Sequence, residues 1–266
     1  LRYFLTDYRV IAAIGVFALG IGAAATVFSV VDAILIRPLP FPQADRLAVI
    51  YATQPSRGVG RGGASFPDLN DWRGQLSAFD GIFAFLGSNV SLTGSGDAER
   101  VHAALVSEDF FRVMREQPAL GRAFRGDEWK PGGPKVVILS DALWRRRFGG
   151  DQRTVGRAAT VDGERYEIVG VMPPGFDFPD VEVWTPFTFP PDVATREERA
   201  LGAVVRLRDG VSIGMTQAQL DAFNARLERA YPATNAGWQA RMVSLHDDLA
   251  ADFRSGLYLL AAAVVL

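Results

Sequence analysis

The longest apolar stretch of the chain runs from Val10 to Val31. Its 22 residues carry no charge, and only Thr26 and Ser29 have hydrogen-bonding side chains. A helix rises about 1.5 Å per residue, so about 20 apolar residues cross a hydrocarbon core about 30 Å thick. The pattern therefore predicts a membrane-spanning helix over residues 10–33, which anchors the rest of the chain.

Small residues recur within this stretch. Gly15, Gly22 and Ser29 repeat every seven residues, and Thr26 follows Gly22 by four. Small side chains let two helices approach closely in lipid, where no hydrophobic force drives helices together. We expect the small residues of the span to form a helix–helix contact. The predicted contact residues are Gly15, Gly20, Gly22, Thr26 and Ser29.

Two other interpretations fit parts of the same stretch. Residues 20–25 contain G-x-G-x-x-A, which opens a dinucleotide-binding fingerprint. A true fingerprint meets an acidic residue about 20 positions later, whereas Asp32 comes too early. A cleaved signal peptide has an apolar region of only about 7–15 residues and a small-residue cleavage site, and no such site stands out. A signal anchor is therefore the better interpretation.

Charges beside the span predict its orientation. The N-terminal flank, residues 1–9, carries two arginines against one aspartate, whereas the far flank carries Asp32 and Arg37. By the positive-inside rule we expect residues 1–9 in the cytoplasm.

A second apolar run, residues 256–266, ends the sequence. Its eleven residues are too few to cross a bilayer. We interpret this run as the truncated start of a second span, in preference to a buried terminal helix.

Between the apolar ends the pattern changes to short elements typical of an α+β domain. Strands are expected at residues 47–53, 82–92, 100–106, 135–139, 181–184, 203–208 and 238–245. Helices are expected after the N-caps Ser65, Ser107 and Ser140, and from a capping box at Thr216 to the residue before Pro232. Residues 54–64, rich in glycine, proline and serine, are expected to form a loop.

The middle of this region differs from its two ends in composition and in the elements that it predicts. Asp162-Gly163 lies between two β-rich runs, which predicts a hairpin with a type I′ turn over residues 158–171. Residues 173–191 are dense in proline and phenylalanine. The change of texture predicts a β-rich subdomain, residues 118–190, inserted into a βαβ-type domain. The outer domain would consist of residues 45–117 and 200–246.

Composition and charge exclude several classes of function. The formal net charge of −2 gives no field that favours nucleic acid. The absence of cysteine excludes disulfides and thiolate metal sites. No P-loop or nucleophile elbow occurs, and His102 and His246 lie far apart. We expect no bound cofactor, no metal and no catalytic residue.

The remaining charged and aromatic segments each allow two interpretations. The adjacent acids Glu197-Glu198 and Asp247-Asp248 are expected to be solvated in preference to forming a catalytic pair. Residues 145–147, three arginines, are expected to form a solvated helix face, with an anionic partner as the alternative. Residues 173–191 are expected to pack within their own subdomain, with a docking surface as the alternative.

Several motifs together resemble those of a known family. They are Gly20-Ile21-Gly22-Ala23 leading to Ile36-Arg37-Pro38-Leu39-Pro40, Ser65-Phe66-Pro67-Asp68 with Asp71-Trp72-Arg73, Ile138-Leu139-Ser140-Asp141 and Ile168-Val169-Gly170-Val171-Met172-Pro173-Pro174-Gly175. With these motifs the chain resembles ABC transporter permeases of the MacB/FtsX type, especially the duplicated permeases common in acidobacteria.

The resemblance implies a bacterial inner-membrane protein with a periplasmic core domain over residues 34–255. This domain would have a porter-like part, residues 45–117 and 200–246, and an inserted subdomain, residues 118–190. The family hydrolyses ATP on a separate nucleotide-binding subunit, so the implied partners are an ABC ATPase, a periplasmic adaptor, and a second copy or intramolecular duplicate.

The implied function is non-enzymatic: a permease component for export or mechanotransmission. An FtsX-like regulator of a cell-wall hydrolase is the alternative. A membrane-tethered hydrolase would need a catalytic constellation that the sequence does not display.

Overall fold

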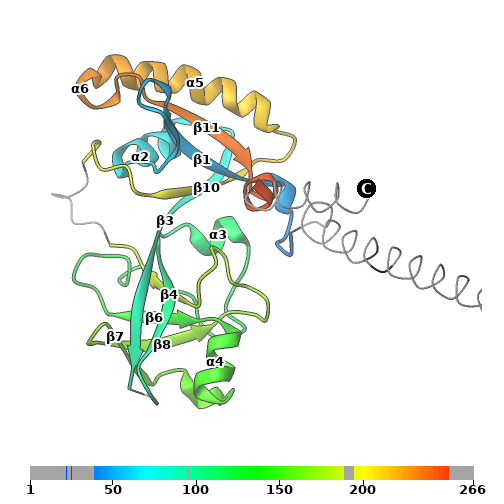
Figure 1. Ribbon diagram of the computed structural model, residues 1–266, viewed down its shortest axis with the longest axis vertical. Helices are drawn as coiled ribbons and strands as arrows, with labels where there is room; N and C mark the ends of the chain where they lie inside the picture. The colour runs from blue at the N-terminus through cyan, green and yellow to red at the C-terminus, as the bar shows by residue number, and fades with distance from the viewer. Residues whose placement is uncertain (1–21, 23–24, 26–38, 95, 189–194, 252–266) are drawn as a thin grey trace, which may run out of the picture. The chain divides into compact units, whose positions relative to one another are not determined.

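The computed structural model describes residues 22, 25, 39–94, 96–188 and 195–251 (Figure 1). The chain divides into two compact units, Phe41–Val243 and a second unit made of Leu1–Pro40 and Ser244–Leu266. In the second unit residues 245–251 are helical. The expected spans, residues 10–33 and 256–266, lie almost entirely outside the described residues. Within the described part of the chain, no helix combines the length and apolar character needed to cross a membrane.

The unit Phe41–Val243 begins and ends in an α/β lobe, which we call the first lobe. Its strands are β1 (Leu47–Gln54), the first half of β3 (Phe79–Thr93), β10 (Gly202–Leu207) and β11 (Gln239–Ser244), in the order β11-β1-β10-β3. Strand β10 is antiparallel to both β1 and β3. The two βαβ units are therefore interleaved, as in split βαβ folds.

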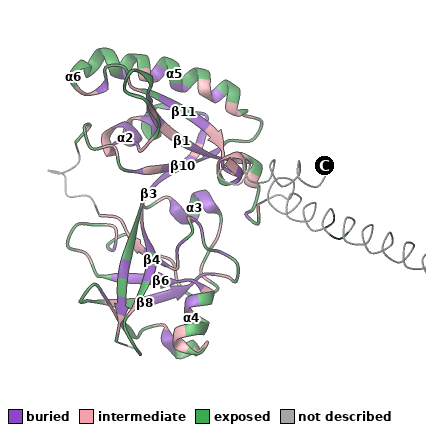
Figure 2. Ribbon diagram, in the orientation of Figure 1, coloured by how far each residue is buried: buried purple, intermediate pink, exposed green. Residues whose placement is uncertain are grey.

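Two helices cover one face of this sheet. Helix α2 (Phe66–Gln75) connects β1 to β3, and α5 (Ile213–Ala230) leads through the short α6 (Pro232–Asn235) to β11. Both helices contribute to one core, in which Trp72 and Leu220 pack with strand residues such as Ile50 and Val205. Buried positions line the inner sides of α2 and α5, and exposed positions their outer sides (Figure 2). The expected βαβ alternation is confirmed.

The second lobe is a closed ring of strands. It consists of the second half of β3, β4 (Glu99–Val106), β9 (Val183–Pro186), β6 (Val136–Leu139), β8 (Glu164–Val171) and β7 (Ala158–Val161). Each of these strands pairs with the next, and β7 pairs back to β3. The short β5 (Leu120–Gly121) is added outside β8. Closure leaves these six strands without a free edge over their paired lengths.

The core of the ring draws on residues from both sides of position 118. Val90 and Val101, from β3 and β4, pack with Val137, Ile168 and Leu143, the last of these from helix α4 (Asp141–Phe148). Strand β3 continues from the first lobe into the ring without a break. The boundary expected at residue 118 therefore does not coincide with the start of this core, because the ring needs β3 and β4 to close.

Local signals for turns and caps were confirmed at three places. Ser65 accepts a hydrogen bond from the Asp68 amide at 3.2 Å, and Ser140 accepts one from the Leu143 amide at 3.1 Å. Asp162 and Gly163 have φ values of 48° and 82°. Positive φ at both central residues is the requirement of a type I′ turn.

Three local predictions were wrong. Ser107 does not cap α3 (Phe110–Met114); its hydroxyl oxygen accepts from the Ala84 amide in β3 instead. Helix α5 begins before Thr216, because Ser212 caps it and the Thr216 hydroxyl donates to the Ser212 carbonyl at 2.9 Å. The expected loop at residues 54–64 contains strand β2 (Val59–Gly62), which pairs with the end of β1.

Candidate functional site

The predicted packing residues of the span lie mostly outside the described part of the chain. This applies to Gly15, Gly20, Thr26 and Ser29. Gly22 is described: it is helical and exposed, and a Cβ added there would meet no atom within 4 Å. The helix–helix contact stays a prediction.

A buried carboxylate, Asp68, organises a cluster in the first lobe. Asp68 is 1% exposed and lies in the first turn of α2. One of its oxygens accepts from Arg196 at 2.5 Å and from the Asn235 side chain at 3.0 Å, and the other accepts from Arg199 at 2.5 Å. We call Asp68, Arg196, Arg199 and Asn235 the clamp.

The clamp fixes the segment through which the chain returns from the ring to β10. Arg196 also donates to Asp71 at 2.6 Å and lies over the ring of Tyr231, 3.8 Å from its centroid. Arg199 lies over Trp238 at 4.4 Å. Stacking and charge-assisted hydrogen bonds act together here, so that residues 195–199 are held against α2, α6 and the start of β11.

The electrostatics of the clamp favour the charged arginine. Burial works to lower the pKa of Arg196, but its hydrogen bonds to Asp71 and Asp68 outweigh burial, and its pKa lies above the ordinary value. The side chains of Arg199 and Asp68 are only 6% and 2% exposed. The cluster is thus a water-poor ionic site whose charges depend on one another.

Sequence reasoning did not find the arginines of the clamp. Asp68 belongs to a motif that carries the family resemblance, but Arg196 and Arg199 flank the solvent-exposed pair Glu197-Glu198 and have no pattern of their own. The pairing joins residues 128 and 131 positions apart.

The three arginines of α4 do not form a simple solvated face. Arg146 pairs with Glu99 at 2.7 Å and with Glu182 at 2.8 Å, and Arg147 pairs with Glu99 at 3.1 Å. The Arg147 side chain is only 6% exposed and also donates to the Leu92 carbonyl. The expectation is confirmed in part for Arg145, which pairs with Asp141 within its own helix and stays exposed. Arg146 and Arg147 instead tie α4 to the ring.

Aromatic side chains connect the second lobe to the first lobe. Phe178 lies within 6.4 Å of Phe83 and 6.0 Å of both Phe85 and Phe41, measured between ring centroids. Phe176 and Phe178 are each 5% exposed. Phe178 therefore packs beyond its own subdomain, against β3, and Phe176 packs against Phe110 of α3, so the two buried rings offer no docking surface. We call this cluster the aromatic junction.

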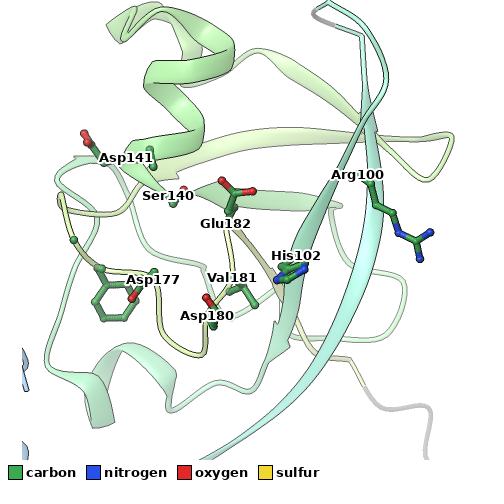
Figure 3. A pocket seen from close by; sticks show the side chains of 11 residues that line it. Arg100, His102, Ser140, Asp141, Asp177, Asp180, Val181 and Glu182 are labelled. Atoms are coloured by element: carbon green, nitrogen blue, oxygen red, sulfur yellow. The ribbon is translucent and has the colours of Figure 1, made fainter. Parts of the chain in front are cut away.

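A hollow of about 420 Å³ lies on the ring between β4, the start of α4 and residues 175–182 (Figure 3). Arg100 and His102 line it from β4, and Asp141 and Glu182 line it while pairing with arginines of α4. Asp177 and Asp180 come from the loop before β9. Burial, and then the charge of Asp180, raises the pKa of Asp177. His102 lines this hollow and His246 is not among its lining residues.

The carboxylates of the hollow do not form a metal centre. Across the described residues, no group of three or more histidine and acidic side chains is arranged to hold a metal ion. The ion pairs of Asp141 and Glu182 use two of the four carboxylates in structural contacts. The hollow therefore offers charge of both signs and an exposed imidazole, an arrangement suited to binding polar groups.

Comparison with known proteins identifies the fold. A family described as the MacB-like periplasmic core domain matches residues 10–223. No curated protein matches the chain. A domain of a protein described as a permease from Porphyromonas gingivalis is similar, with 16% identity and a TM-score of 0.60 over 78% of this chain and 92% of that one.

Two further solved structures share the fold. The periplasmic region of MacB from Actinobacillus actinomycetemcomitans has 13% identity and a TM-score of 0.58 over 79% of this chain and 94% of that one. The extracellular domain of the noncanonic ABC-type transporter YknZ from Gram-positive bacteria has 13% identity and a TM-score of 0.54 over 73% and 98%. Since the family match covers residues 10–223 of 266, this chain belongs to the family of MacB-like periplasmic core domains, which are parts of ABC-type permeases.

Proposed function

We propose that this chain is the permease component of an ABC-type export or mechanotransmission system in the bacterial inner membrane. Its periplasmic domain would relay conformational change from a separate ATPase to a substrate or a periplasmic adaptor. Family membership supports the transporter-associated role. The names of two structural relatives, MacB and an ABC-type transporter, agree with it.

One structural observation supports the proposed transfer of movement between the two lobes. Strand β3 has 15 residues and passes from the sheet of the first lobe into the ring. At about 3.3 Å per residue it is about 50 Å long, a length over which a paired strand acts as a stiff connection. The return segment is held by the clamp, and the aromatic junction fills the space between β3 and the loop before β9. Movement of one lobe is thereby passed to the other.

The membrane part of the proposal rests on the apolar segments. Residues 10–33 would form the first transmembrane helix and residues 256–266 the start of the second, with residues 1–9 in the cytoplasm. Closure of an ATPase can move the periplasmic domain only through helices that pack firmly against neighbours. The small residues at 15, 20, 22, 26 and 29 supply such a packing face. A second copy or an intramolecular duplicate would provide the neighbour.

The test uses the full permease reconstituted with its ATPase subunit. ATP should change amide hydrogen exchange in residues 41–243, and Gly22→Leu should abolish that change or the assembly. Gly22→Ala, which keeps a small side chain, should behave as the native protein. If Gly22→Leu changed neither assembly nor ATP-dependent hydrogen exchange, the proposed relay through this helix would be wrong. Activation of a cell-wall hydrolase without ATP-driven export would favour the FtsX-like regulator.

A further inference from the structure

Strand β11 stands at the end of the sheet in the first lobe. Among the described strands it pairs with β1 alone. A terminal strand presents a row of amide and carbonyl groups on its outer edge, which can pair with an added strand. The state of that outer edge therefore decides whether another chain can add to the sheet.

The carboxamide of Gln217 occupies this edge. Its oxygen accepts from the Met242 amide at 2.7 Å, and its nitrogen donates to the Ala240 carbonyl at 2.8 Å. A carbonyl at position i and an amide at position i+2 point to the same edge of a strand. One side chain of α5 thus makes the pair of hydrogen bonds that the N–H and C=O of one residue in a parallel neighbouring strand would make.

The second amide hydrogen of Gln217 is also used. It donates to Asp221, one turn further along α5, at 2.7 Å. This contact helps to fix the orientation of the carboxamide. Helix α5 runs alongside β11 (Figure 1), so the carboxamide reaches the strand from the helix that covers the sheet.

A hollow of about 560 Å³ lies beside the occupied edge. Gln217 and Asp221 line it from α5, Ala240 and Arg241 line it from β11, and residues 55–60 form the opposite wall. The hollow thus lies against the strand residue, Ala240, whose carbonyl the carboxamide occupies, and its walls carry one acid and one arginine.

We propose that the outer edge of β11 is a strand-addition site for an extended polypeptide segment of a partner, kept closed in the free domain by the carboxamide of Gln217. The partner is recognised through its main chain, which replaces the carboxamide at Ala240 and Met242. This surface stands independently of the proposed transport role.

The first test measures the closed state in the whole chain, prepared in detergent. Gln217→Ala should speed hydrogen exchange at the Met242 amide, because that amide loses its acceptor. Gln219→Ala, a change of the same residue type at an exposed position of the same helix, should not. Unchanged exchange at Met242 in Gln217→Ala would overturn the proposal.

The second test measures opening with a defined probe, a fluorescein-labelled, end-blocked Thr-Val-Thr-Val-Thr peptide. In Gln217→Ala the peptide does not have to displace the two hydrogen bonds that the carboxamide makes to Ala240 and Met242. It should therefore bind this variant about tenfold more tightly than the native chain. The same peptide with alternate amides N-methylated should not bind. Equal binding of the two peptides, or no gain in Gln217→Ala, would contradict main-chain addition.

A second variant, Gln217→Glu, provides the same test if Gln217→Ala does not fold. A glutamate still accepts from the Met242 amide but cannot donate to the Ala240 carbonyl. Peptide affinity should therefore lie between those of the native chain and Gln217→Ala. Affinity equal to that of the native chain would count against the role of the Ala240 contact.

Discussion

Asp68 illustrates how one residue can hold two distant segments. Its carboxylate accepts hydrogen bonds from Arg196, Arg199 and Asn235 while almost no water reaches it. A buried charge is tolerated only when partners satisfy it, and its removal leaves the partners uncompensated. Asp68 is therefore the one carboxylate that both arginines of the return segment share.

Asp68→Asn should lower the free energy of unfolding by about 3 kcal/mol, because two mostly buried guanidinium groups lose the carboxylate that they share. Asp71→Asn is the matched control, since the Asp71 side chain is 34% exposed. It should cost only about 0.5 kcal/mol. Urea unfolding followed by tryptophan fluorescence measures both. Equal small losses would show that the clamp does not stabilise the lobe.

The hollow on the ring yields a prediction about pH. Burial and the charge of Asp180 raise the pKa of Asp177 above its ordinary 3.8. A carboxyl group with a raised folded pKa adds stability that is fully present below the unfolded pKa and is lost as pH rises through the folded pKa. Stability should thus fall slightly as pH rises from 3.8, since Asp177 remains largely exposed.

Asp177→Asn should remove this component of the pH dependence, and Asp180→Asn should reduce it by removing the neighbouring charge. Unfolding temperatures measured across the acidic range give the comparison. An identical slope in the native chain and in Asp177→Asn would show that the group does not titrate abnormally.

Single elements of the fold are set by short-range geometry. The β7–β8 hairpin needs two residues with positive φ, and Gly163, with φ of 82°, supplies one. Helix α2, in contrast, contains Gly74, beside which an added Cβ would meet no atom within 4 Å. The same substitution should therefore have opposite effects at these two positions.

Gly163→Ala should destabilise the chain by about 1 kcal/mol, because a Cβ is strained in the left-handed region. Gly74→Ala should stabilise it by about 0.5 kcal/mol through helix propensity and a less flexible unfolded state. Chemical unfolding of the two variants side by side is the measurement. A stabilising Gly163→Ala would mean that the turn is not type I′ in solution.

Across the whole unit Phe41–Val243, coupling between the lobes depends on the aromatic junction and β3. Phe178→Ala should lower stability by about 3 kcal/mol and weaken that coupling, since its ring packs on two residues of β3. We expect unfolding of the two lobes, followed by hydrogen exchange, to separate into two steps.

Leu143→Ala is the control for the junction, because Leu143 packs inside the ring core. It should lower stability while the lobes still unfold together. Coincident unfolding in Phe178→Ala as well would show that β3 alone couples them.

Short-range signals in the sequence were sufficient for many elements. Short β-rich runs predicted β1, β3, β4 and β10, and the side chains of Ser65 and Ser140 marked two helix starts that the structure confirms. These signals act within about four residues, the reach of a cap or a helical turn. Where two caps lie close together, as at Ser212 and Thr216, the same signal placed the helix start too late.

Only the tertiary structure decided the closure of the ring, the clamp and the edge of β11. Arg206 shows why: it lies in an apolar strand pattern, yet it is wholly buried, donates to the Val113 carbonyl at 2.5 Å and has a pKa lowered to about 10 by burial. Val113 lies 93 positions away. Periodicity and caps carry no information about such distant partners, because the free energy of these contacts arises only after the chain has brought both groups out of water.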